Sequence, residues 1–222
     1  MMSKEESSKN HKDLKEHGII YLAGGIDESL SENVCKEIIE YNISGKVECI
    51  QMIINSHGGS CTDGFAIIDI MEWSRLPVYT TGIGMICSMA LLIFMTGAKG
   101  RRVITPRTSI LSHRYSTKTQ GNHSQLLADR KEQDLMHERV VDHYLHNTHI
   151  DTREKLEGYL LRDVDTWLST GEALEYGIAD IVEPLSRDGL EIKMKKKTSG
   201  KKKKDRKDTD KTPVLFGRQV LG

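Results

Sequence analysis

Short apolar segments alternate with amphipathic helical segments in this chain, and the alternation constrains its fold more than any other feature. Apolar segments typical of buried strands occupy residues 18–23, 49–54 and 77–83. Between them, apolar residues recur at helical spacing over residues 31–42, where Ser31 is a candidate N-cap, and over residues 62–73. Strands that alternate with helices pair in parallel. The sequence therefore predicts an α/β fold of stacked βαβ units.

The rest of the chain continues this pattern with shorter elements and one long helix. We expect a helix at 88–96, strands at 102–105 and 109–112, a long helix at 124–148, helices at 153–161 and 170–176, and a closing strand at 178–182. The long helix has mostly charged residues and histidines between its apolar positions. Gly24 with Gly25, and the segment 55–60, are predicted turns.

Charge is distributed unevenly along the 222 residues, although the formal net charge is zero. Residues 193–222 contain 12 Lys or Arg residues and 3 Asp residues, so they carry +9 and residues 1–192 carry −9. We expect a flexible segment at 1–17, one domain at 18–185, and a Lys-rich disordered tail at 186–222. The tail is most simply a solvated run of charge, and nucleic acid is a further candidate partner for it.

The cysteine pattern and the lack of long apolar segments indicate a cytoplasmic protein. Cys35, Cys49, Cys61 and Cys87 form no CxxC pair, so we expect reduced thiols and no metal site. Residues 1–18 lack the apolar core of a signal peptide. The longest apolar segment, residues 85–95, is too short to cross a bilayer, so no membrane partner is expected.

Three residues in the order Ser, His, Asp are candidates for nucleophilic catalysis. Ser88 precedes an apolar helix, His113 follows a predicted strand, and Asp165 precedes residues 166–169. A serine hydroxyl needs a base to accept its proton, and the base needs an acid that orients it. Each residue also has a simpler structural interpretation. Ser88 suits a helix N-cap, His113 suits a surface or structural histidine at a strand end, and Asp165 suits a helix cap. Asp163 competes with Asp165 for the acid role.

A glycine pair at 58–59 has two interpretations. Glycines at 58 and 59 lie in the segment Asn-Ser-His-Gly-Gly-Ser, which suits a tight turn. A backbone without side chains can also turn its N–H groups toward a developing oxyanion.

Together these segments resemble the proteolytic subunit of the Clp protease, the ClpP family of the crotonase-like superfamily. The resemblance extends over about residues 18–183. It rests on Ile-Ile-Tyr-Leu-Ala-Gly-Gly-Ile at 19–26, the glycine segment at 55–60, Cys-Ser-Met-Ala at 87–90, Thr-Gly-Ala-Lys-Gly at 96–100, Ile-Leu-Ser-His at 110–113, Asp-Thr-Trp-Leu-Ser at 165–169 and Tyr-Gly-Ile-Ala-Asp at 176–180. A divergent virus-encoded member would fit the same motifs.

The resemblance implies a serine endopeptidase with a catalytic triad. Ser88 would be the nucleophile, His113 the base and Asp165 the orienting acid, with the N–H groups of Gly59 and Met89 as the oxyanion hole. No metal or organic cofactor is implied, and ATP would be used only by a partner ATPase. The substrates would be peptides or unfolded proteins.

The resemblance also implies an assembly. Residues 121–150 would form a protruding handle that joins two heptameric rings into a tetradecamer with the active sites inside. A Clp-type AAA+ unfoldase is the implied partner, although Gln51 and Ile53 stand where the family usually has tyrosines in the ATPase-docking pocket, and His57 replaces a proline.

Three alternatives remain open at this point. The first is a capsid or head-maturation type protease that works without an ATPase. The second is a ring subunit whose triad is present but not aligned for catalysis. The third is an acyl-CoA enzyme of the crotonase type, which a complete Ser-His-Asp set disfavours.

Overall fold

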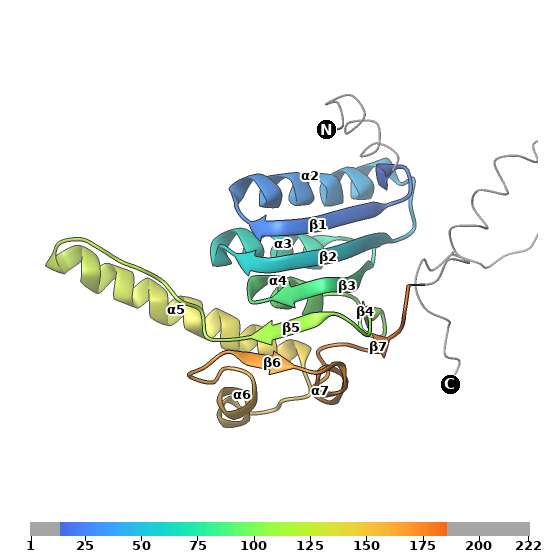
Figure 1. The fold of residues 1–222 in the computed structure, drawn as a ribbon. Coiled ribbons are helices and arrows are strands. Elements are labelled where there is room, and N and C mark those ends of the chain that lie inside the picture. Colours follow the sequence, from blue (N-terminus) through green and yellow to red (C-terminus); the bar gives the residue numbers. More distant parts are fainter. Residues whose placement is uncertain (1–13, 186–222) are drawn as a thin grey trace, which may run out of the picture.

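The computed structural model describes residues 14–185, and these form an α/β fold, as predicted (Figure 1). The predictions for residues 1–13 and 186–222, including the basic tail, lie outside the described residues. In chain order the elements are β1 (Ile19–Ile26), α2 (Glu28–Ser44), β2 (Ile50–Gly59), α3 (Cys61–Trp73), β3 (Val78–Cys87), α4 (Met89–Met95), β4 (Arg102–Ile104), β5 (Ser109–Ser112), α5 (His123–Asn147), α6 (Arg153–Tyr159), β6 (Thr166–Leu168), α7 (Thr170–Glu175) and β7 (Ile181–Val182).

A single sheet organises the described part of the chain. Its main path is β1-β2-β3-β4-β7, and every pair along this path is parallel. β5 pairs in parallel with the carboxyl-terminal half of β3, and β6 pairs with β5 in the antiparallel direction. The predicted parallel βαβ arrangement is therefore confirmed, while β6 was not among the predicted strands.

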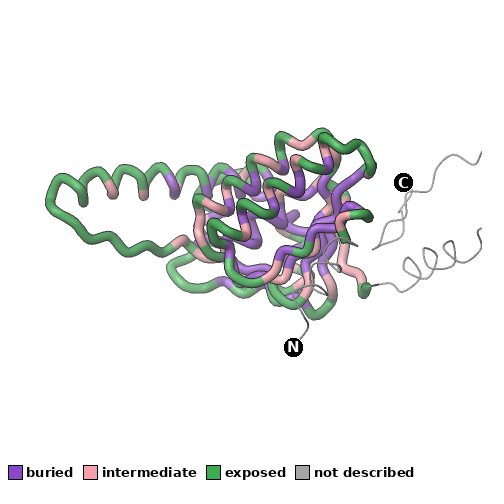
Figure 2. Tube along the Cα trace, turned by 90° about the horizontal axis from the view of Figure 1, so that it is seen from above, coloured by how far each residue is buried: buried purple, intermediate pink, exposed green. Residues whose placement is uncertain are grey.

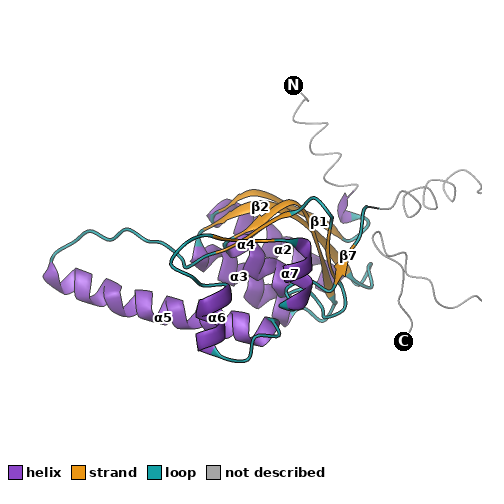
Figure 3. Ribbon diagram, turned by 60° about the horizontal axis from the view of Figure 1, so that its bottom comes forward, coloured by secondary structure: helices purple, strands orange, loops and turns teal. Residues whose placement is uncertain are grey.

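Helices α2, α3 and α4 lie on one face of this sheet (Figures 1 and 3). All seven residues of α4 are buried, so the helix that follows Ser88 forms part of the core. An entirely apolar helix is stable only when every side is covered by other elements. Ser88 is therefore attached to one of the most enclosed elements of the fold, and its position depends on the packing around α4.

The first helix begins earlier than the predicted N-cap at Ser31. Asp27 is the N-cap of α2, and its side chain accepts a hydrogen bond from the Leu30 N–H. Ser31 is instead buried one turn inside the helix, where its hydroxyl donates to the Asp63 carbonyl of α3 over 2.9 Å. The prediction was wrong because both residues are good cap types, and tertiary packing against α3 decided between them.

Both predicted glycine turns are extended strand ends. β1 continues through Gly25 to Ile26 with an irregularity in register after Ala23, and β2 continues to Gly59. The pairs Gly25↔Gly58 and Ile26↔Gly59 join the two ends. Glycine is needed at Gly59 because a Cβ there would overlap the backbone of Ile26. The glycines therefore allow two strand ends to approach closely.

Helix α5 projects from the body of the protein as a long arm, with the segment before it running back alongside (Figures 1 and 2). The outer part of the arm is mostly exposed, whereas its base is buried against the core. Asn122 and Gln125 form a capping box that begins the helix. The Tyr115 hydroxyl donates to the Gln133 carbonyl over 2.5 Å and fastens the returning segment to the helix. The predicted long helix is confirmed.

Within the described residues, no helix combines the length and the apolar character needed to cross a membrane.

Candidate active site

The predicted nucleophile Ser88 lies between the end of β3 and the start of α4. It has φ 56° and ψ −126°, and it is the one non-glycine residue with positive φ among residues 14–185. Such backbone conformations cost about 1–3 kcal/mol and persist where the surrounding structure enforces them, often at active sites. A serine on a sharp turn from strand to helix is also the arrangement that presents a nucleophilic hydroxyl in many hydrolases.

The simpler interpretation of Ser88, as a helix cap, does not describe its side chain. Ser88 occupies the N-cap position of α4, but its hydroxyl makes no capping hydrogen bond. Its carbonyl accepts from Leu91 N over 2.9 Å and from Leu92 N over 3.4 Å. The helix is thus started by the backbone of Ser88, and the half-buried hydroxyl is left for another role.

The glycine segment at the end of β2 lies directly against Ser88. Gly58 has φ 91°, and a Cβ built on it would lie 2.7 Å from both the Ser88 Cβ and the Cys87 carbonyl oxygen, and 3.1 Å from the Met89 nitrogen. A side chain at this position would therefore displace the turn that carries Ser88. The Ser56 hydroxyl further fixes the segment by accepting from the Gly58 N–H over 3.1 Å and donating to the Gly24 carbonyl over 2.6 Å.

Strand pairing brings the backbones of the three candidate residues to one place. The Ser88 N–H donates to the Leu111 carbonyl over 3.0 Å, which sets Ser88 beside the end of β5. β5 pairs with β6 at Ser112↔Thr166, and His113 directly follows the first of these residues while Asp165 directly precedes the second. The edge that holds these strand ends is also where ligands commonly bind in parallel sheets.

The backbones of the three residues lie near one another in the sheet, but their side chains are not linked by hydrogen bonds. Between residues 14 and 185, no hydrogen bond joins any two of the Ser88, His113 and Asp165 side chains. His113 is half-buried and Asp165 is exposed. Catalytic hydrogen bonds are often long before substrate binds and shorten in the reacting complex.

The competing acid, Asp163, is paired elsewhere. Its carboxylate lies 3.1 Å from the Arg114 guanidinium, and that guanidinium also donates to the Leu161 carbonyl over 2.7 Å. Asp165 directly precedes β6, at the strand end that His113 follows on β5.

The end of β5 is held from behind by the base of α5. The Ser112 hydroxyl donates to the Leu160 carbonyl over 2.8 Å and lies 2.7 Å from the Tyr144 hydroxyl. Burial raises the pKa of Tyr144 well above its usual value, so it remains a neutral phenol. Sequence reasoning missed this link, because a serine and a tyrosine separated by 32 residues carry no motif.

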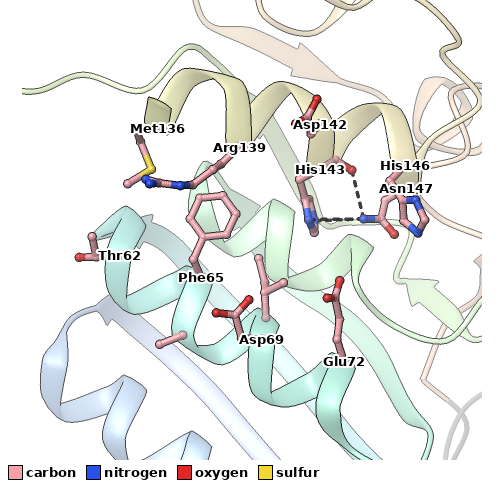
Figure 4. A pocket seen from close by; sticks show the side chains of 12 residues that line it. Thr62, Phe65, Asp69, Glu72, Met136, Arg139, Asp142, His143, His146 and Asn147 are labelled. Atoms are coloured by element: carbon pink, nitrogen blue, oxygen red, sulfur yellow. Dashed lines mark hydrogen bonds between the residues drawn. The ribbon is translucent and has the colours of Figure 1, made fainter. Parts of the chain in front are cut away.

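A buried histidine on α5 was also missed. His143 is 8% exposed and borders a cavity of about 810 Å³ between α3 and α5, lined also by Phe65, Met136 and Asp142 (Figure 4). Burial lowers its pKa to about 4, and the positive charges of His146 and Lys99 act in the same direction. The neutral imidazole is therefore the resident form at neutral pH. His143 is three residues after Val140 and four before Asn147, and this helical spacing on the buried face could have indicated that the histidine is buried.

Because of His143, we expect acid to destabilise the fold. Its pKa is about 4 when folded and about 6.5 when unfolded, so between these values the unfolded chain binds more protons. Stability from the neutral imidazole is complete above about pH 6.5 and is lost as the pH falls toward 4. Urea unfolding measures this effect. Between pH 7 and pH 4.5, the free energy of unfolding should fall less for His143→Leu than for the wild type. Equal drops in the two proteins would contradict the assignment.

Comparisons with known proteins agree with this architecture. The family model described as Clp protease matches residues 2–184. The ATP-dependent Clp protease proteolytic subunit of Deinococcus radiodurans is 31% identical over 186 residues, covering 83% of this chain and 89% of that protein. The ATP-dependent Clp protease proteolytic subunit 2 of Treponema denticola is 28% identical over 169 residues, covering 76% and 83%.

Proposed function

Since this chain belongs to the Clp protease family and is a serine-type peptidase, we propose that Ser88, His113 and Asp165 form its catalytic triad. The observation that carries the proposal is the backbone of Ser88, whose positive φ and uncapped side chain suit a nucleophile on a strand-to-helix turn. The strand register that brings His113 and Asp165 to the same edge supports the other two roles.

In this mechanism the Ser88 oxygen attacks the carbonyl carbon of a peptide bond while the His113 imidazole accepts the serine proton. Asp165 orients the imidazole and stabilises the imidazolium that forms. When the tetrahedral intermediate collapses, the C–N bond breaks and His113 protonates the departing amine. Water, deprotonated by His113, then attacks the acyl-serine ester and releases the second product. These steps require no metal or organic cofactor.

We assign the oxyanion hole to the N–H groups of Gly59 and Met89. The Met89 N–H is in the first turn of α4, where helical geometry provides no acceptor. The Ser60 N–H donates to the Ile26 carbonyl on the β1 side over 2.8 Å. Successive N–H groups of an extended strand point in opposite directions, which directs the Gly59 N–H toward the β3 side and Ser88. Two such donors stabilise the negative oxygen of the intermediate.

The contrast between two neighbouring carboxylates tests the acid assignment. Asp165→Asn should lower kcat on the order of 10⁴-fold, because the amide no longer holds the imidazole in the correct tautomer or stabilises the imidazolium. Asp163→Asn removes only the exposed pair with Arg114, so it should leave kcat within about twofold. Steady-state hydrolysis of a short fluorogenic peptide measures both. The reverse ranking would move the acid role to Asp163.

We further propose that the active sites lie inside a tetradecamer of two heptameric rings, joined through the α5 arms. The exposed arm supports this, because it extends away from the core and most of its outer surface has no intramolecular partner among the described residues (Figure 2). Unfolded proteins and peptides would be the substrates, and an ATP-driven unfoldase would deliver folded ones. The names of the two relatives, both proteolytic subunits of an ATP-dependent protease, support this partner.

The chamber is tested by native mass spectrometry together with substrate selection. We expect a tetradecamer that cleaves short peptides and an unfolded protein, but leaves the same protein intact when it is folded. Active monomers, or equal cleavage of the folded and unfolded forms, would contradict the chamber while leaving the triad assignment in place.

One observation favours a second candidate function, a ring subunit that is inactive until a partner aligns it. The three triad side chains lack mutual hydrogen bonds within residues 14–185. Assembled rings that hydrolyse peptides without any added protein would exclude this candidate.

A further inference from the structure

His143 connects the base of the α5 arm to the helix that follows the nucleophile. Its Nε2 lies 3.0 Å from the Leu92 carbonyl oxygen of α4. A carbonyl oxygen only accepts hydrogen bonds, so Nε2 carries the proton. The Asn147 side-chain nitrogen lies 3.4 Å from both ring nitrogens, so it packs against the ring and does not single out Nδ1. The Leu92 contact therefore determines which ring nitrogen carries the proton, and Asn147 lies beside the ring (Figure 4).

The ring is also fixed from the side of α3. Phe65 contacts it edge to face, with ring centroids 6.3 Å apart and an interplanar angle of 82°. Three helices therefore meet at His143, and the side chain has little freedom to rotate. A buried imidazole held in this way can transmit the position of α5 to α4.

Leu92 links this contact to the active site. Its carbonyl accepts from His143, and its N–H donates to the Ser88 carbonyl over 3.4 Å. The Ser88 carbonyl and the Met89 N–H belong to one planar peptide unit and point in opposite directions. Any rotation of that carbonyl therefore turns the Met89 N–H away from the oxyanion it is proposed to bind.

We propose that His143 is a positioning residue for the peptidase reaction, which holds α4 against α5 so that the Met89 N–H points at the oxyanion. This inference rests on the proposed function of Ser88 and Met89. The next residue of α5, Tyr144, contacts Ser112 and so holds the segment before His113 in a similar way. Consecutive residues at the base of the arm thus contact Leu92, one helical turn after the nucleophile, and Ser112, directly before the base.

The variant His143→Leu distinguishes a positioning role of His143 from a contribution to folding. Leucine fills much of the same buried space but cannot donate to Leu92. The Leu92 carbonyl would still accept from the Thr96 hydroxyl over 3.0 Å and from the Thr96 N–H over 3.2 Å, so no buried acceptor is left unpaired. We therefore expect His143→Leu to assemble normally and to melt within about 3 °C of the wild type at pH 7.

The full-length variants His143→Leu and His143→Gln are compared with the wild type by peptide hydrolysis and by the rate of labelling with a fluorophosphonate probe. His143→Leu should lower kcat about tenfold with KM unchanged, because an interaction made only in the transition state is weakened. Labelling should slow by a similar factor. His143→Gln, whose terminal amide can reach the position of Nε2, should recover most of both rates.

The outcomes distinguish this inference from the proposed function. A folded and assembled His143→Leu with wild-type kcat and labelling would overturn the positioning role. If the leucine variant does not assemble, His143→Gln and His143→Asn decide instead, because the shorter asparagine amide cannot reach Leu92, and equal rates in these two would overturn it. Failure of the wild type to label at Ser88 would instead contradict the proposed function itself.

Discussion

Replacing Ser88 with alanine should abolish peptide hydrolysis, with kcat lowered by at least about 10⁴-fold. The substitution removes the attacking oxygen of the proposed nucleophile, so the acyl-enzyme cannot form at this position. The backbone of Ser88 has positive φ, which alanine tolerates no worse than serine. The fold and the assembly should therefore survive, and a fluorogenic peptide assay on material of confirmed native mass measures the effect.

Ser169→Ala is the matched control for this experiment. Ser169 is the N-cap of α7, where its side chain accepts from the Glu172 N–H as part of a capping box. Loss of the cap should cost about 1 kcal/mol of stability and leave kcat unchanged. Residual hydrolysis in Ser88→Ala above about 1% of the wild-type rate would mean that another residue is the nucleophile.

Replacing Asp180 with asparagine should lower the free energy of unfolding by about 3–5 kcal/mol. The Arg102 guanidinium is 2% exposed, and it binds both carboxylate oxygens of Asp180, over 2.5 and 2.9 Å. Burial opposes ionisation of Asp180, but the hydrogen bonds and charge of Arg102 outweigh it and lower its pKa. The variant would leave a buried cation without its counter-charge. Urea unfolding at pH 7 measures the loss.

An exposed ion pair provides the control for the Asp180 variant. Arg130 and Asp134 pair over 3.0 Å on the surface of α5, and both side chains are mostly exposed. Asp134→Asn should change stability by no more than about 0.5 kcal/mol. Similar losses from Asp134→Asn and Asp180→Asn would mean that burial does not set the strength of the Arg102 pair.

The Arg102 pair also explains how the arm is anchored. Arg102 donates to the Asn147 carbonyl at the end of α5 over 2.9 Å, and Lys99 donates to the same oxygen over 2.8 Å. Cations at a helix carboxyl terminus satisfy its free carbonyls and oppose its negative potential. The base of the arm is thus joined to β4, as well as to α4 and β5.

Hydrophobic periodicity predicted most elements of the fold because each has one clearly apolar face or is wholly buried. It was weaker where local preference and tertiary pairing conflict. Asn55, His57 and the two glycines that follow favour a turn, but pairing with β1 extends them into β2. β6, at Thr166–Leu168, is too short for alternation to be recognised, and its pairing with β5 is what defines it.

The sequence order Ser, His, Asp was enough to propose the triad residues, since the surrounding motifs are specific. It could not reveal the strained backbone of Ser88, because φ at this position is set by β3, α4 and the close approach of Gly58. The motif at residues 165–169 favoured Asp165 over Asp163, but the pairing of Asp163 with Arg114 could not be predicted from the sequence. His143 was hidden among nine histidines, because only packing distinguishes a buried imidazole from a solvated one.

The central claim is that Ser88 is an activated nucleophile, and the most direct test is to react the full-length protein with a fluorophosphonate probe and map the adduct by peptide mass spectrometry. We expect one adduct, on Ser88, that is lost in Ser88→Ala and forms far more slowly in His113→Ala. An assembled protein that forms no adduct, or one that forms it on another serine, would contradict the claim.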